Sequence, residues 1–112
     1  MTEKQKVICH KIFSHYGIEK QLRQLIEECA ELIQACSKSL RAGDEFKANQ
    51  NGETLQKLYD ASDLIEEELA DVEIMLEQIK DYYLFSDPVE DKIEYKLGRQ
   101  LQRIEKESAD ND

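Results

Sequence analysis

Two pairs of carboxylates, each pair separated by three positions, are the residues of this chain best suited to do chemistry. Glu28 and Glu31 occur in "EECAE", and Glu68 and Asp71 occur in "ELAD". Residues three apart lie on the same face of a helix, so each pair can present its oxygens to one point. Ligands that are all oxygen favour a hard divalent ion, Mg²⁺ or Mn²⁺, over zinc or copper.

The second pair interrupts the apolar stripe of a predicted helix. At about 100° per residue, Glu68 and Asp71 lie among the apolar residues of that stripe. A buried carboxylate needs a proton, a basic partner or a metal ion. A salt bridge to a lysine or arginine on a neighbouring helix is therefore one explanation, and a metal site is the other. The stripe consists of Leu64, Ile65, Val72, Met75, Ile79 and Tyr82.

The first pair is placed differently on its helix. Together with Glu27, it lies away from the main apolar stripe, which favours a solvated acidic face unless another helix or subunit covers it. If both pairs meet, four carboxylates about 6 Å apart repel by roughly 15 kcal/mol at an effective dielectric of about 20. Such an arrangement requires cations.

A basic stripe follows near the end of the chain. Lys92, Lys96, Arg99 and Arg103 share one face of a predicted helix. A solvated face is the simplest interpretation. Cations beside a carboxylate-bound metal also suit phosphate-ester chemistry, because both neutralise developing negative charge. The sequence offers no nucleophilic triad and no Walker-type glycine loop, so water would be the nucleophile.

The helical periodicity predicts an all-α protein, an antiparallel four-helix bundle in a single domain over residues 1–112. We expect Gly17 to close the first helix and Asp87, as N-cap, to open the fourth. Asp63 is expected to cap the third helix. The helices are predicted at about 3–15, 18–42, 63–85 and 87–106, with a loop or insertion at 43–60 and a frayed tail at 108–112.

Composition limits the partners. The formal net charge of −10 argues against nucleic-acid or anionic-membrane binding, since both require a positive field. No apolar run approaches the roughly 18 residues of a membrane span, and the start lacks the apolar core of a signal peptide, so a cytoplasmic location is expected. Three cysteines, an odd number, fit a reducing compartment. Cys29 and Cys36 are predicted to be buried thiols rather than metal ligands.

The two acidic motifs, in order on consecutive helices and followed by a basic helix, resemble those of the MazG-like nucleoside triphosphate pyrophosphohydrolases. The resemblance extends from "HYGIEKQLRQLIEECAELIQA" through "LIEEELADVEIMLEQI" to "EYKLGRQLQRIE". It is closest to small single-domain members of bacterial and phage genomes. The segment between the motifs is longer here than in compact members, and Gly98 replaces an asparagine found in some of them.

The resemblance implies Mg²⁺-dependent hydrolysis of a nucleoside triphosphate between the α and β phosphates, and a homodimer or homotetramer whose helices complete the site. It implies metal ligation by the four paired carboxylates and a catalytic or additional ligand role for Glu27. The basic residues would contact the substrate phosphates. Two alternatives stay open: a non-catalytic helical oligomer acting as a binding or regulatory module, and a member that binds nucleotide without hydrolysing it. The implied ligands are Glu28, Glu31, Glu68 and Asp71, and the implied phosphate contacts are Lys92, Lys96, Arg99 and Arg103.

Overall fold

The structure, a computed structural model, describes residues 1–111, and these form four helices without a strand. The prediction of an all-α chain with four helices is confirmed. The chain divides into two compact units, one from Met1 to Ile79 and one from Lys80 onward, so α3 crosses from the first to the second. The helices are α1 (Glu3–Tyr16), α2 (Ile18–Ala48), α3 (Gly52–Tyr83) and α4 (Ser86–Asn111).

The first unit begins with α1, and local hydrogen bonds explain both ends of this helix. The Thr2 hydroxyl accepts a hydrogen bond from the Gln5 backbone N–H at 3.1 Å, and the Gln5 side chain accepts one from the Thr2 N–H at 2.8 Å. This reciprocal capping box satisfies two backbone donors. At the other end, Gly17 has φ +85°, which glycine adopts without the steric cost of a Cβ. As predicted, Gly17 closes α1, and α2 starts at the next residue.

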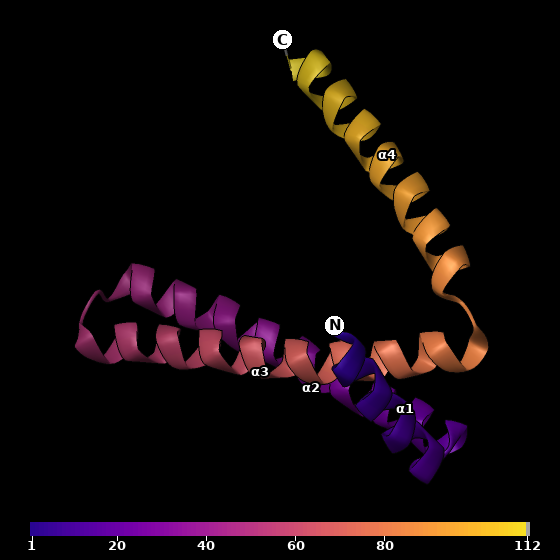
Figure 1. Cartoon of the computed structure of the whole chain (residues 1–112). Coiled ribbons are helices and arrows are strands. Elements are labelled where there is room, and N and C mark those ends of the chain that lie inside the picture. The colour runs from indigo at the N-terminus through magenta and orange to yellow at the C-terminus, as the bar shows by residue number, and fades with distance from the viewer. Residues whose placement is uncertain (112) are drawn as a thin grey trace. The chain divides into compact units, whose positions relative to one another are not determined.

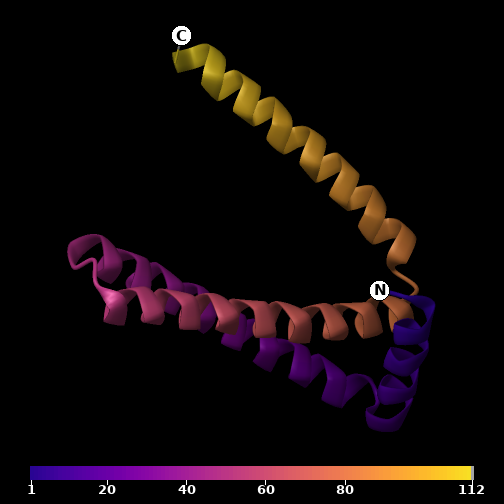
Figure 2. The same ribbon diagram turned by 60° about the vertical axis from the view of Figure 1, so that its left-hand side comes forward.

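The pair α2 and α3 forms an antiparallel hairpin (Figures 1 and 2). The Gln21 amide donates a hydrogen bond to the Gln78 side-chain oxygen at 2.7 Å, and Lys57 forms an ion pair with Glu45 at 3.1 Å. Because one contact lies near each end of the hairpin, the two fix the register between the helices. Between them lie the small buried residues Ala35, Ala42 and Ala61.

The predicted loop over residues 43–60 is wrong, because most of this segment is helical. α2 continues to Ala48, and α3 begins at Gly52 rather than near Asp63. The connection needs only residues 49–51, because Asn51 caps α3: its side-chain oxygen accepts a hydrogen bond from the Thr54 N–H at 2.9 Å. The Thr54 hydroxyl accepts one from the Asn51 N–H at 3.2 Å in return.

The second unit contains the end of α3 and the whole of α4. The end of α3 is closed by Leu84, which has φ +58°, and by a hydrogen bond of 2.9 Å from the Phe85 N–H to the Lys80 carbonyl. α4 begins one residue before Asp87, so the predicted N-cap lies inside the first turn. It extends through residues 108–111, where a frayed tail was predicted; Asp112 lies outside the described residues.

No residue of α4 is buried, and its apolar side chains Ile93, Leu97, Leu101 and Ile104 are exposed. The packing of α4 into a four-helix bundle therefore stays a prediction. Within residues 1–111, no helix combines the length and the hydropathy that crossing a membrane requires.

Candidate metal centre

The α2–α3 interface brings the two predicted carboxylate pairs together. Glu28, Glu68 and Asp71 each offer one oxygen, and these oxygens lie within 4.8 Å of one another. Glu31 lies beside Glu68, close enough for one carboxyl to donate a hydrogen bond to the other, and Glu28 is placed in the same way beside Asp71. The i, i+3 pair of α2 thus faces the i, i+3 pair of α3. We call these four residues the carboxylate cluster.

Two carboxylate oxygens of the cluster are buried without a hydrogen-bond partner. These atoms are Oε2 of Glu28 and Oε2 of Glu68. Glu68 as a whole residue is only 9% exposed. The other oxygen of Glu28 accepts a hydrogen bond from the Gln24 amide at 2.7 Å. Buried polar atoms in folded proteins are nearly always paired, and an unpaired one costs about 1–3 kcal/mol or more if charged. These unpaired oxygens therefore need a proton, a basic side chain or a cation as partner.

That partner is not a basic side chain of the described residues. Within residues 1–111, no lysine or arginine forms an ion pair with any of the four carboxylates. The salt bridge considered as an explanation for Glu68 and Asp71 is therefore not what the structure contains. A proton or a cation remains as the means to offset the charge.

The electrostatics of the cluster follow from this arrangement. Burial, and after it the neighbouring carboxylates Glu31, Glu28 and Asp71, together raise the pKa of Glu68 to about 7. The pKa of Asp71 is also raised, first by burial and then by Glu28. Both shifts favour the protonated acid over the carboxylate. A divalent cation would reverse them, because it stabilises the charged form of each ligand.

The sequence left open whether any helix covers the acidic face of α2. The acids of α2 lie away from its most apolar stripe, and α3 packs on the side that carries Glu28. α3 therefore covers this face at Glu28, which is half-buried, whereas Glu27 and Glu31 are exposed.

The apolar stripe of α2 is only partly covered: Leu25 and Leu32 are half-buried, whereas Ile26, Ile33 and Leu40 are exposed. The prediction that Cys36 is buried is wrong, because it is exposed, and Cys29 is half-buried.

The remaining predicted site residues lie outside the cluster. Glu27 is exposed on α2, next to Glu28 in the chain. The basic residues lie on α4 in the second unit, and each is exposed; Arg99 also lies over the ring of Tyr95, at 5.8 Å from its centroid. Their roles stay predictions. These basic residues are Lys92, Lys96, Arg99 and Arg103.

Sequence reasoning missed three glutamines near the cluster. The Gln24 amide donates a hydrogen bond to Glu28, whereas the side chains of Gln21 and Gln78 form a buried amide pair. A signal for the pair was present: Gln21 precedes Glu28 by seven residues, and Gln78 follows Asp71 by seven. Seven residues are nearly two full helical turns, so the two pairs lie along the same interface.

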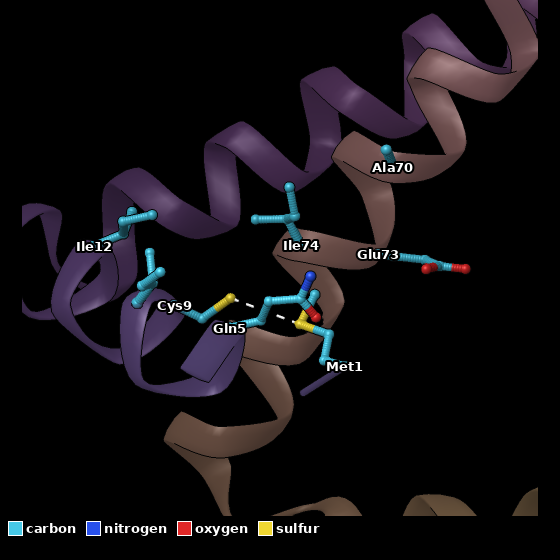
Figure 3. A pocket seen from close by; sticks show the side chains of 8 residues that line it. Met1, Gln5, Cys9, Ile12, Ala70, Glu73 and Ile74 are labelled. Atoms are coloured by element: carbon cyan, nitrogen blue, oxygen red, sulfur yellow. Dashed lines mark hydrogen bonds between the residues drawn. The ribbon is translucent and has the colours of Figure 1, made fainter. Parts of the chain in front are cut away.

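A cavity of the first unit lies elsewhere. It has a volume of about 380 Å³ and lies between α1 and α3, with a mainly apolar lining that includes Ile8, Ile12 and Ile74. Figure 3 shows the Cys9 thiol directed at the Met1 sulfur, at 3.8 Å. Ala70, another lining residue, is two positions after Glu68 and hence about 200° around α3. The cavity is therefore separate from the carboxylate cluster.

Comparisons of the chain with protein-family models, with curated proteins and with solved structures return no match. Membership of the MazG-like family thus stays a prediction from the motifs.

Proposed function

We propose that this chain hydrolyses a nucleoside triphosphate between the α and β phosphates, with Mg²⁺ or Mn²⁺, to a nucleoside monophosphate and pyrophosphate. The observation that carries the proposal is the carboxylate cluster, with its two orphaned buried oxygens and no basic partner within residues 1–111. Four carboxylates from two helices have the donor chemistry of a hard divalent ion. The resemblance of the motifs supplies the reaction.

In this proposal, separate residues bind the metal ion and accept the proton of the attacking water. The carboxylate cluster holds the ion, and its fixed position between α2 and α3 keeps the ligands in place. When bound, such an ion polarises phosphate oxygens and lowers the pKa of water. Glu27, exposed beside Glu28, accepts the proton of the attacking water or serves as an additional ligand. The ligands are Glu28, Glu31, Glu68 and Asp71.

The basic stripe of α4 would contact the substrate phosphates. Arginine matches phosphate oxygens through two parallel hydrogen bonds, whereas lysine acts as a point charge. In a chain with a net charge of −10, these cations would offset the repulsion between the protein and a polyanionic substrate. A cytoplasmic location and assembly as a homodimer or homotetramer belong to the same proposal.

The test is pyrophosphate release from a panel of ribo- and deoxynucleoside triphosphates with Mg²⁺. We expect release by the wild type and loss of at least about a hundredfold in Glu68→Gln, which keeps the side-chain shape but removes a ligand charge. Glu66→Gln, an exposed acid on the same helix, is the matched control and should keep full activity.

Two results would contradict the proposal. If the wild type releases no more pyrophosphate than Glu68→Gln at high protein concentration, the chain is not a pyrophosphohydrolase for that panel. If metal and nucleotide still bind in that case, as titration calorimetry with a nonhydrolysable nucleotide would detect, a non-catalytic nucleotide-binding module is the function instead.

A further inference from the structure

A second cavity of the first unit opens along the same α2–α3 interface as the carboxylate cluster. It has a volume of about 340 Å³, and its lining includes three basic residues, Lys38 and Arg41 of α2 and Lys57 of α3. All three are exposed, so their positive charge is accessible from solvent. Two acids, Glu45 and Asp60, also line it. We call this cavity the basic groove.

Both acids of the basic groove already have a partner beside them. Glu45 forms the 3.1 Å ion pair with Lys57 and, by this hydrogen bond and its charge, raises the pKa of that lysine. Asp60 accepts a hydrogen bond of 2.9 Å from a glutamine amide one turn earlier on α3. Within residues 1–111, neither Lys38 nor Arg41 forms an ion pair. These two cations are therefore available to bind an anion.

The basic groove and the carboxylate cluster are neighbours along the hairpin. Lys38 follows Glu31 by seven residues, about two turns of α2. Leu64, which lines the groove, precedes Glu68 by about one turn of α3. Side chains of a helix lean toward its N-terminus. Because the helices are antiparallel, this direction takes Lys38 and Arg41 toward Glu31 and takes Glu68 toward the groove, so the two features converge.

The spacing of the two features suits a chain of phosphates. Glu31 and Lys38 are separated by about 10.5 Å of helix at 1.5 Å per residue, and both long side chains reach into this interval. One phosphate group could contact only one of the two features, whereas successive phosphates could contact both. Arginine offers phosphate two parallel hydrogen bonds and lysine offers a point charge. The basic groove therefore has the chemistry to hold the far end of a polyphosphate whose near end lies at the carboxylate cluster.

We propose that the basic groove binds the β- and γ-phosphates of the nucleoside triphosphate, the part that leaves as pyrophosphate, through Lys38 and Arg41. This inference rests on the proposed function and adds phosphate contacts in the first unit at residues outside the two acidic motifs. Along α2, Glu27 and Glu28 lie on the other side of Glu31 from Lys38. The α-phosphate thus lies near the proposed proton acceptor, and the terminal phosphate points toward Arg41.

The first test is titration calorimetry of the full chain with inorganic pyrophosphate and Mg²⁺. Lys38→Gln and Arg41→Gln should each weaken binding by about tenfold, and the double variant by about a hundredfold, because each change removes a charge-assisted hydrogen bond. Lys47→Gln is the matched control: Lys47 is exposed on α2, nine residues and hence half a turn around from Lys38, and should bind as the wild type does. Far-UV circular dichroism checks that the variants stay helical. A wild type that does not bind pyrophosphate, or a double variant that binds as tightly as the wild type, overturns the proposal.

A second variant tests whether one ligand contacts both features. Glu68→Gln should weaken pyrophosphate binding in Mg²⁺ by at least about tenfold, because the anion would share the metal ion of the carboxylate cluster. Glu66→Gln, on the exposed side of α3, should leave it unchanged. If Glu68→Gln binds pyrophosphate as tightly as the wild type, the groove and the cluster are separate sites and the proposal is wrong.

Kinetics distinguish this inference from the proposed function. With the nucleoside triphosphate that the wild type hydrolyses, Lys38→Gln/Arg41→Gln should lower kcat/KM by at least about tenfold. Hydrolysis with an unchanged kcat/KM in the double variant would overturn the basic groove and leave the proposed function standing. Pyrophosphate binding that depends on Lys38 and Arg41, in a wild type that hydrolyses none of the panel, would support the groove as a polyphosphate site and overturn the proposed hydrolysis.

Discussion

Two polar contacts lie along the same α2–α3 interface, seven residues apart on each helix. One contact is between neutral amides and the other is between carboxyl groups. At one level Gln21 and Gln78 form a neutral amide pair, 2.7 Å from donor to acceptor, in which Gln78 is only 2% exposed. At the other level Glu28 meets Asp71, with Glu31 and Glu68 one turn further along. Both levels bury polar atoms between the same two helices.

The two contacts differ in whether their polar groups can satisfy one another's hydrogen bonds. An amide carries both a donor and an acceptor, so two glutamines can satisfy each other. An ionised carboxylate only accepts, so four ionised carboxylates cannot satisfy one another. A proton can join Glu31 to Glu68 or Glu28 to Asp71, but Oε2 of both Glu28 and Glu68 is unpaired. The amide pair stabilises the hairpin and its register. The carboxylate cluster costs stability unless something else binds, as is typical of functional sites.

The largest expected effect is the response of the carboxylate cluster to Mg²⁺. Metal bound only by the folded state stabilises it by mass action, by about 2.7 kcal/mol at a hundred times the dissociation constant. We expect the melting temperature of the wild type to rise with Mg²⁺, and that of Glu68→Gln to stay flat. Differential scanning fluorimetry with Glu66→Gln as control measures both. An equal rise in Glu68→Gln would mean that the metal binds elsewhere.

In metal-free protein, substitutions at the amide pair and at the carboxylate cluster should change the free energy of unfolding in opposite directions, and by less than Mg²⁺ does. Gln78→Leu leaves the Gln21 amide buried without its partner and should cost about 1–3 kcal/mol. Gln21→Leu/Gln78→Leu should recover most of that loss, because both polar groups are gone. Glu68→Gln, in contrast, should stabilise the metal-free chain, since it removes a buried charge among like charges. Urea unfolding of the four proteins measures this contrast, and a destabilised Glu68→Gln would refute it.

The part of this interface that lies on α3 was predictable from the sequence. Most of the apolar stripe of α3 lies on its core face, so periodicity alone placed Glu68 inside, where the structure has it. Asp71, which was predicted on the same face, is exposed.

Periodicity was less successful on α2, because only part of its apolar stripe is covered: Leu25 and Leu32 are half-buried, whereas Ile33 is exposed. The buried residues of α2 are Gln21, Ala35 and Ala42, and the two alanines are small enough for close packing between helices.

The predicted loop failed for a related reason. Residues 43–60 are polar and contain two glycines, which suggested a loop, yet Phe46 and Leu58 continue the interface periodicity as half-buried residues. The signal for a short turn was the Asn51–Thr54 cap at the start of α3. A polar stretch in a hairpin needs only one apolar contact per turn to stay helical, because the partner helix supplies the burial.

The two levels should also respond differently to pH. The folded pKa of Glu68, about 7, is raised above its ordinary value of 4.5. Its contribution to stability is therefore fully present below pH 4.5 and is lost as the pH rises through 7. We expect the melting temperature of the metal-free wild type to fall between pH 5 and about 7.5 more steeply than that of Glu68→Gln. The amide pair does not titrate, so Gln78→Leu should keep the wild-type slope; equal slopes in wild type and Glu68→Gln would exclude Glu68 as the source.

The smallest effect concerns Gln24, whose side-chain amide donates a hydrogen bond to Glu28. It is the one amide donor in contact with the carboxylate cluster among the hydrogen bonds described above. Gln24→Ala removes that donor with little change in helix propensity, and should cost about 0.5–1.5 kcal/mol without metal. Because the amide also orients Glu28, metal affinity should fall by about tenfold, at the low end for groups that position a ligand. Titration calorimetry with Mn²⁺ measures the affinity. If Gln24→Ala binds Mn²⁺ as tightly as the wild type, Glu28 is held in place by the helix alone, and the donor of Gln24 serves only to offset its buried charge.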